Sequence, residues 1–106
     1  MREGGRGAFL GWALVRGESM EPALSAGDRL LVSYRRGPVA GDVVVARFAD
    51  GTLAVKRAAE RRTTGWWLLS DNAGAGVDSR HRGPVADADV LAVVLARVWP
   101  RPACRL

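Results

Sequence analysis

Short apolar runs separated by turn residues are the feature that most restricts the fold of this 106-residue chain. The runs cover residues 8–15, 28–34, 42–48, 52–59, 65–70 and 89–99. Gly, Pro and Asp-Gly sequences between them are typical of turns and hairpins. Helical periodicity hardly occurs beyond one short turn at 21–25. The pattern therefore predicts an all-β fold, a compact antiparallel β-sheet with one short helical turn.

The length is enough for one domain with a single core. Residues 1–7 are rich in Gly and Arg and are expected to form a flexible tail. Residues 8–99 are expected to form the domain, and residues 100–106 a Pro/Arg tail because two prolines stop regular structure there.

Composition excludes several kinds of function. The net charge of +5 and the pI near 10.9 suit an acidic partner, but the arginines are scattered and not interleaved with aromatic residues, so no nucleic-acid interface is expected. One cysteine, Cys104, excludes an intrachain disulfide, and together with one histidine it is too little for a zinc or iron site. No metal or other cofactor is expected. The apolar run 8–15 is far shorter than the roughly 20 residues of a membrane span, and none is expected.

Lysine usage points to a chemical role for one residue. Of the 16 basic residues 15 are Arg, and Lys56 is the only lysine. Arginine does not lose its proton in a protein, whereas a buried lysine does, and so lysine can serve as a general base. Alternation along strand 52–59 places Ala54 and Ala58 on the same face as Lys56, where they leave room for a neighbour and exclude water. An exposed strand shows the same alternation, so a solvated lysine is the other interpretation.

Ser19 is the candidate nucleophile for that base. It lies between Gly17 and Pro22, which favour a sharp, irregular backbone. A serine hydroxyl becomes a good nucleophile when a neighbouring base takes its proton, and a desolvated lysine is one such base. The alternatives are that Ser19 caps a short helix, or that His81 is the base, although His81 is flanked by two arginines that oppose its protonated form.

Four ordered motifs strengthen the dyad hypothesis because they resemble the boxes of the signal peptidase I family of Ser/Lys peptidases. The motifs are Gly17-x-Ser19-Met20-x-Pro22-x-Leu24, Gly27-Asp28, Val55-Lys56-Arg57, and Asp71-Asn72 with Asp78-Ser79-Arg80 and Gly83. Four further segments are Gly27-Asp28-Arg29-Leu30-Leu31-Val32, Val55-Lys56-Arg57-Ala58, Ala59-Glu60-Arg61-Arg62 and Gly65-Trp66-Trp67. In these segments the chain most resembles, within that family, the short nickel-type superoxide dismutase maturation proteases.

The resemblance implies a coiled, barrel-like β-sheet as the catalytic core and assigns roles to the matching residues. Ser19 and Lys56 are the implied catalytic dyad, in a nucleophile loop with Gly17, Met20 and Pro22. The implied supporting residues are Arg57, Asp71, Asn72, Asp78, Ser79 and Arg80, which buttress the lysine strand. The backbone N–H of Ser19 and one further donor would meet the oxyanion.

The chain departs from the family at two positions. Gly17 stands where many members have a serine that assists the oxyanion site, and Gly76 stands where the family commonly has a serine that orients the lysine. Water, backbone or Ser79 would then have to orient Lys56. The membrane anchor that most members carry is also absent from this sequence, which favours a cytoplasmic substrate.

The resulting hypothesis is a cytoplasmic serine endopeptidase that removes an N-terminal pro-segment. Its expected partner is a protein precursor bound as an extended peptide, and the expected precursor is the pro-form of nickel superoxide dismutase. The alternatives are a general signal peptidase-like protease that lacks its own anchor, and a non-catalytic basic binding module on the same scaffold. A self-cleaving repressor is disfavoured because no helical DNA-binding segment precedes the core.

Overall fold

The computed structural model describes residues 9–106, and the expected flexible tail at 1–7 lies outside the described residues. Six strands form one antiparallel sheet: β1 (Leu10–Leu14), β2 (Arg29–Ser33), β3 (Val43–Arg47), β4 (Leu53–Arg62), β5 (Gly65–Leu69) and β6 (Val90–Trp99). A short helix, α1 (Ser79–Arg82), and a single 3-10 turn, η1 (Asp87–Asp89), lie between β5 and β6. The all-β prediction is confirmed.

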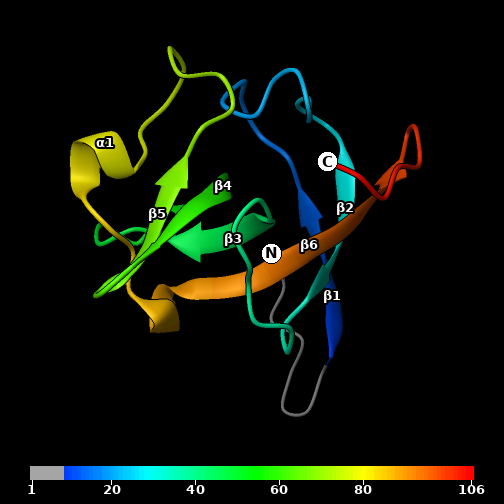
Figure 1. The fold of residues 1–106 in the computed structure, drawn as a ribbon. Helices are drawn as coiled ribbons and strands as arrows, with labels where there is room; N and C mark the ends of the chain where they lie inside the picture. Colours follow the sequence, from blue (N-terminus) through cyan, green and yellow to red (C-terminus); the bar gives the residue numbers. More distant parts are fainter. Residues whose placement is uncertain (1–8) are drawn as a thin grey trace.

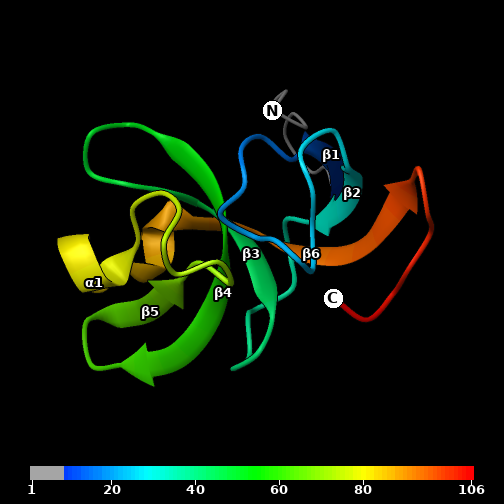
Figure 2. The same cartoon turned by 90° about the horizontal axis from the view of Figure 1, so that it is seen from above.

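The sheet has the order β1-β2-β6-β3-β4-β5 and is not closed into a barrel. The first part of β6 pairs with β3, and its later part pairs with β2, with register shifts in both ladders. Figure 1 shows β6 running below β3, β4 and β5 and crossing β1 and β2, and Figure 2 shows it joining the β1–β2 side to the β3–β4–β5 side. One long strand therefore links the two halves of the molecule.

Two apolar clusters fill the interior, one in each half. The first contains Val15, Met20, Leu24, Leu30, Val32, Val43, Val45, Ala92 and Val94. The second contains Val44, Ala46, Phe48, Ala58, Trp66, Leu68, Val85 and Val93. Successive residues of β3 belong to different clusters because side chains alternate across a strand. Burial on both faces explains why β3 reads as an uninterrupted apolar run.

Strand β4 is longer than the sequence indicated. It extends past residue 59 to Arg62 and pairs with β5 across a register shift near Ala58. The added residues are polar, and two of them place guanidinium groups over tryptophan rings: Arg61 over Trp66 and Arg62 over Trp67. These contacts let a charged segment continue as a strand.

Helical structure also lies elsewhere than expected. The expected helical turn at 21–25 lies one residue earlier, where the N–H of Leu24 donates to the Met20 carbonyl at 2.9 Å, and it does not continue into a helix. The Asp28 carboxylate accepts the backbone N–H of Ser25 where this segment ends. The helix α1 lies inside the expected polar loop 71–83. The Asp78 side chain accepts the N–H of His81, and His81 Nδ1 accepts the N–H of Asp78, which together form a capping box; Asp78 also accepts the N–H of Arg80.

The segment after β6 folds back on the domain. Ala103 forms a two-way backbone bridge with Arg97, and Leu106 packs against the first apolar cluster. Figure 1 shows this segment returning beside β2. Within residues 9–106 no helix has the length and apolar character needed to cross a bilayer.

We predict that Gly65→Ala destabilises the fold by about 1–3 kcal/mol. The backbone of Trp66 exchanges two 2.8 Å hydrogen bonds with Val85, so a Cβ on Gly65 would collide with the Val85 carbonyl oxygen, and the φ of +146° disfavours a side chain as well. Urea unfolding measures the change. Gly37→Ala is the control, since a Cβ there meets no heavy atom within 4 Å; equal stability of both variants would contradict the prediction.

Candidate active site

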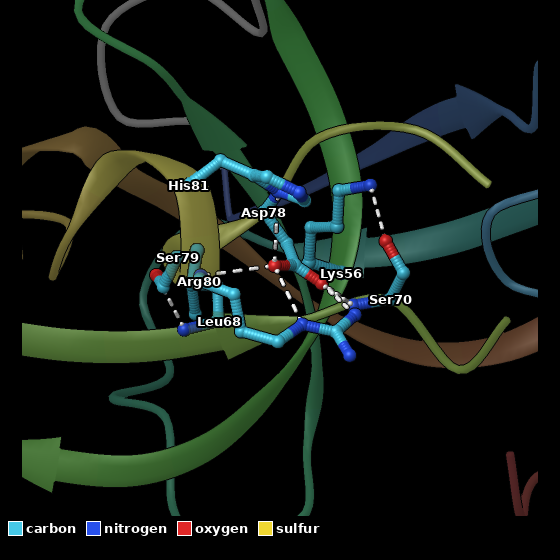
Figure 3. A network of polar contacts seen from close by, with 7 residues as sticks. All are labelled: Lys56, Leu68, Ser70, Asp78, Ser79, Arg80 and His81. Atoms are coloured by element: carbon cyan, nitrogen blue, oxygen red, sulfur yellow. Dashed lines mark hydrogen bonds and ion pairs between the residues drawn. The ribbon is translucent and has the colours of Figure 1, made fainter. Parts of the chain in front are cut away.

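Lys56 lies in the middle of β4 and its side chain is buried, with 3% of its surface exposed. Its Nζ donates a 2.9 Å hydrogen bond to the Oγ of Ser70, which is also buried. Figure 3 shows the amine at the end of the Lys56 side chain, joined by a dashed line to the Ser70 hydroxyl. Burial lowers the pKa of Lys56 because desolvation disfavours the ammonium form; Asp78 raises this pKa and Arg80 lowers it.

Strand pairing explains why Ser70 meets this lysine. Arg57 of β4 is paired with Leu69 of β5 in an antiparallel ladder. Their neighbours Lys56 and Ser70 therefore face each other where the β4–β5 pairing ends. Ser70 was not among the residues predicted from the sequence. Its position directly before Asp71-Asn72, at the end of an expected strand, is the signal that was available.

Ser19 lies on the loop between β1 and β2, and loop 70–78 holds it there. The N–H of Asn72 donates to the Ser19 carbonyl at 2.8 Å, and the Asn72 side chain donates to the Glu18 carbonyl at 3.2 Å. Figure 1 shows the two loops beside each other above the sheet. Two segments that are distant in the sequence are thereby joined at the expected nucleophile.

Gly76 shows how close Ser19 and Lys56 are. A Cβ built on Gly76 would lie 3.3 Å from the Cβ of Ser19 and 3.5 Å from the Nζ of Lys56. Both side chains therefore approach one point, next to a glycine with a φ of +77°. Of the other nucleophile-loop residues, Gly17 has a φ of +74°, and Met20 is buried in the first apolar cluster.

Asp78 is the buried anion of the site. It has no exposed surface and accepts the N–H of Ser70 at 2.9 Å and the Nε of Arg80 at 3.1 Å. Hydrogen bonds from the Arg80 side chain and from the backbone N–H groups of Ser70 and Arg80 hold the pKa of Asp78 far below its ordinary value. Asp78 and Arg80 form their ion pair at the start of α1, where Asp78 is the N-cap, and not across one face of an extended segment (Figure 3).

The remaining predicted residues make structural contacts. Arg57 forms an ion pair with Asp71, with 2.6 Å between Nη2 and Oδ2. Ser79, which the sequence offered as a partner for Lys56, instead accepts the N–H of Leu68 at 2.9 Å. His81 takes part in the cap of α1. No group of three or more potential metal ligands is present among residues 9–106.

A groove of about 750 Å³ lies between β1 and the start of β4. One wall is β1, an edge strand that, among the described strands, pairs with β2 on one side only. The other wall is the start of β4, whose edge toward β5 is unpaired before Arg57 within residues 9–106. The lining includes Trp12, Leu14, Leu53, Val55 and Trp99, which are wholly or partly exposed. The lining also includes Arg16, three residues before Ser19, and Ala54 and Val55, which directly precede Lys56; Ser19 and Lys56 themselves are not part of it.

Comparison with known proteins identifies the class. The family model described as Peptidase S24-like matches residues 5–94, which is most of the chain. The chain belongs to the Peptidase S24-like family. This S24-like chain is also similar to mitochondrial inner membrane protease subunit 1 of Schizosaccharomyces pombe, with 33% identity over 115 aligned positions that cover 84% of this chain and 73% of the relative. Family and relative together support a serine-type peptidase of the signal peptidase kind.

Proposed function

We propose that this S24-like chain is a serine endopeptidase in which Ser19 is the nucleophile and Lys56 the general base. The convergence of the two side chains at Gly76, one of them a buried amine, is the observation that supports the proposal most. Ser19 Oγ attacks the scissile carbonyl while Lys56 Nζ accepts its proton. Lys56 then gives a proton to the leaving amine, and water hydrolyses the acyl-enzyme on Ser19.

The groove supports an extended peptide as the substrate. Unpaired strand edges on both walls are suited to main-chain hydrogen bonds with an added strand, and the apolar lining is suited to alternate side chains of that strand. A segment near the N-terminus of a precursor, exposed and extended, meets this requirement. We propose the pro-form of nickel superoxide dismutase, in the cytoplasm, as the substrate, on the grounds of the sequence resemblance.

A direct test incubates the purified protein with that precursor and follows the amino-terminal mass. We expect cleavage at one bond, with a secretory preprotein as the comparison substrate. Preferential cleavage of the preprotein would replace the substrate assignment by a general signal peptidase-like activity. Cleavage of neither, together with salt-dependent binding of nucleic acid, would favour a basic binding module.

The pH dependence of cleavage follows from the state of Lys56. The base must be neutral, so kcat/KM should rise with pH as Lys56 loses its proton. Because burial lowers the pKa of Lys56, the midpoint of this rise should lie below 10.5, the ordinary value. Initial rates across a pH series measure the midpoint. A rise centred at or above the ordinary value would show that Lys56 is not the base.

A further inference from the structure

The hydroxyl of Ser70 has a place in the site that the dyad alone does not explain. Lys56 Nζ donates to it at 2.9 Å, and both side chains are buried. In the described part of the chain, Lys56 makes no other side-chain hydrogen bond. A neutral amine has two hydrogens and one lone pair, so fixing one hydrogen on Ser70 restricts the directions in which the lone pair can point.

We infer that Ser70 is a positioning residue, which directs the lone pair of Lys56 toward Ser19. This inference rests on the proposed function, because it concerns the base of the same reaction. Ser70 acts on Lys56 and does not itself contact the scissile bond in this mechanism.

The backbone of Ser70 is fixed independently of its hydroxyl. Its N–H donates to the buried carboxylate of Asp78, and its neighbour Leu69 is held in the β5 ladder. Asp78 is in turn paired with Arg80. The hydroxyl therefore starts from a rigid point, as precise orientation of a catalytic group requires.

The position of Gly76 supports the same role for Ser70 independently. A side chain at that position would lie next to both Ser19 and Lys56, so it is a second place from which a hydroxyl can reach the amine. In this chain the position has no side chain, and its φ of +77° disfavours one. The sequence left water, backbone or Ser79 to orient Lys56; the orienting hydroxyl instead comes from Ser70, directly after β5.

The charged groups that face the amine are Asp78, at the start of α1, and Arg80, within it. Ser70→Ala leaves both in place, because the bond from residue 70 to Asp78 is made by the backbone. The ammonium form of Lys56 loses a hydrogen-bond acceptor in this variant. The pKa of Lys56 should therefore move further down, while the unfixed amine becomes a poorer catalyst.

The first measurement is kinetic. Ser70→Ala should lower kcat by about 10- to 100-fold with little change in KM, and it should move the midpoint of the pH–rate rise to lower pH. Ser70→Thr keeps the hydroxyl and should retain most of the activity. Ser33→Ala is the matched control, a buried serine at the end of β2 whose hydroxyl accepts the N–H groups of Arg35 and Arg36.

The second measurement does not depend on activity. Because Lys56 is the only lysine, selective labelling with ¹³C-lysine gives one ε-carbon NMR signal from the chain. Its pH titration should have a lower midpoint in Ser70→Ala than in the wild type, and the wild-type midpoint in Ser33→Ala. An unchanged titration in Ser70→Ala would overturn the inference, and so would wild-type kcat. Failure of the proposed function would give a different result: the wild-type protein itself would cleave no peptide, whatever the NMR titration of Lys56 shows.

Discussion

Lys56→Met should lose at least about a thousandfold in kcat/KM while becoming more stable at neutral pH. The activity is lost because the base is removed. The stability increases because the folded wild type holds an amine whose charged form is desolvated, whereas Met is apolar, unbranched and close to lysine in length. Peptide cleavage and thermal unfolding measure the two effects.

The pH dependence of stability distinguishes this explanation from a simple packing effect. The pKa of Lys56 is lower in the folded than in the unfolded chain, so between the two values the unfolded chain binds more protons. Wild-type stability should therefore rise with pH across that window, up to the ordinary value of 10.5. Lys56→Met should lack this contribution. A parallel pH dependence in both proteins would mean that the amine is not desolvated.

Asp78→Ala should be the most destabilising substitution in the site, by about 2–4 kcal/mol. It removes a fully buried carboxylate and leaves the N–H of Ser70 without its acceptor. Arg80 loses its ion-pair partner too, but its side chain is partly exposed and water replaces part of that interaction. Chemical denaturation measures the loss. Asp87→Ala removes an exposed ion pair with Arg61 and should change stability little, so similar losses in both variants would contradict this account.

Acid should act on the wild type through the same carboxylate. The pKa of Asp78 is lower in the folded chain, so its contribution to stability is present above the unfolded pKa and is lost as the pH falls toward the folded value. The wild type should therefore weaken progressively in acid, whereas Asp78→Ala should lack this part of the pH dependence.

Local patterns predicted the strands but not all of their lengths. Apolar runs such as 42–48 lie between turn residues, and their hydrophobicity alone indicates burial. The end of β4 depends instead on stacking between Arg61 and Trp66, which becomes visible only when two strands are paired. The helix α1 has four residues, too few for a periodic pattern, and it depends on the cap that Asp78 provides.

The sequence predicted those residues of the candidate site that are distinctive in composition or in their neighbours. Lys56 is conspicuous as the only lysine, and Ser19 is framed by residues that favour a sharp turn. No comparable sequence feature distinguishes Ser70. It meets Lys56 because Arg57 pairs with Leu69, and a register of this kind between strands cannot be read from either strand alone.

Cleavage of a precursor by wild type, Ser19→Ala and Lys56→Arg, measured side by side, tests the dyad most directly. Lys56→Arg keeps the positive charge but cannot act as a base near neutral pH. We predict that the wild type releases one N-terminal fragment and that both variants, checked to be folded by circular dichroism, release none. Cleavage by folded Lys56→Arg would contradict the role of Lys56, and cleavage by Ser19→Ala would exclude Ser19 as the nucleophile.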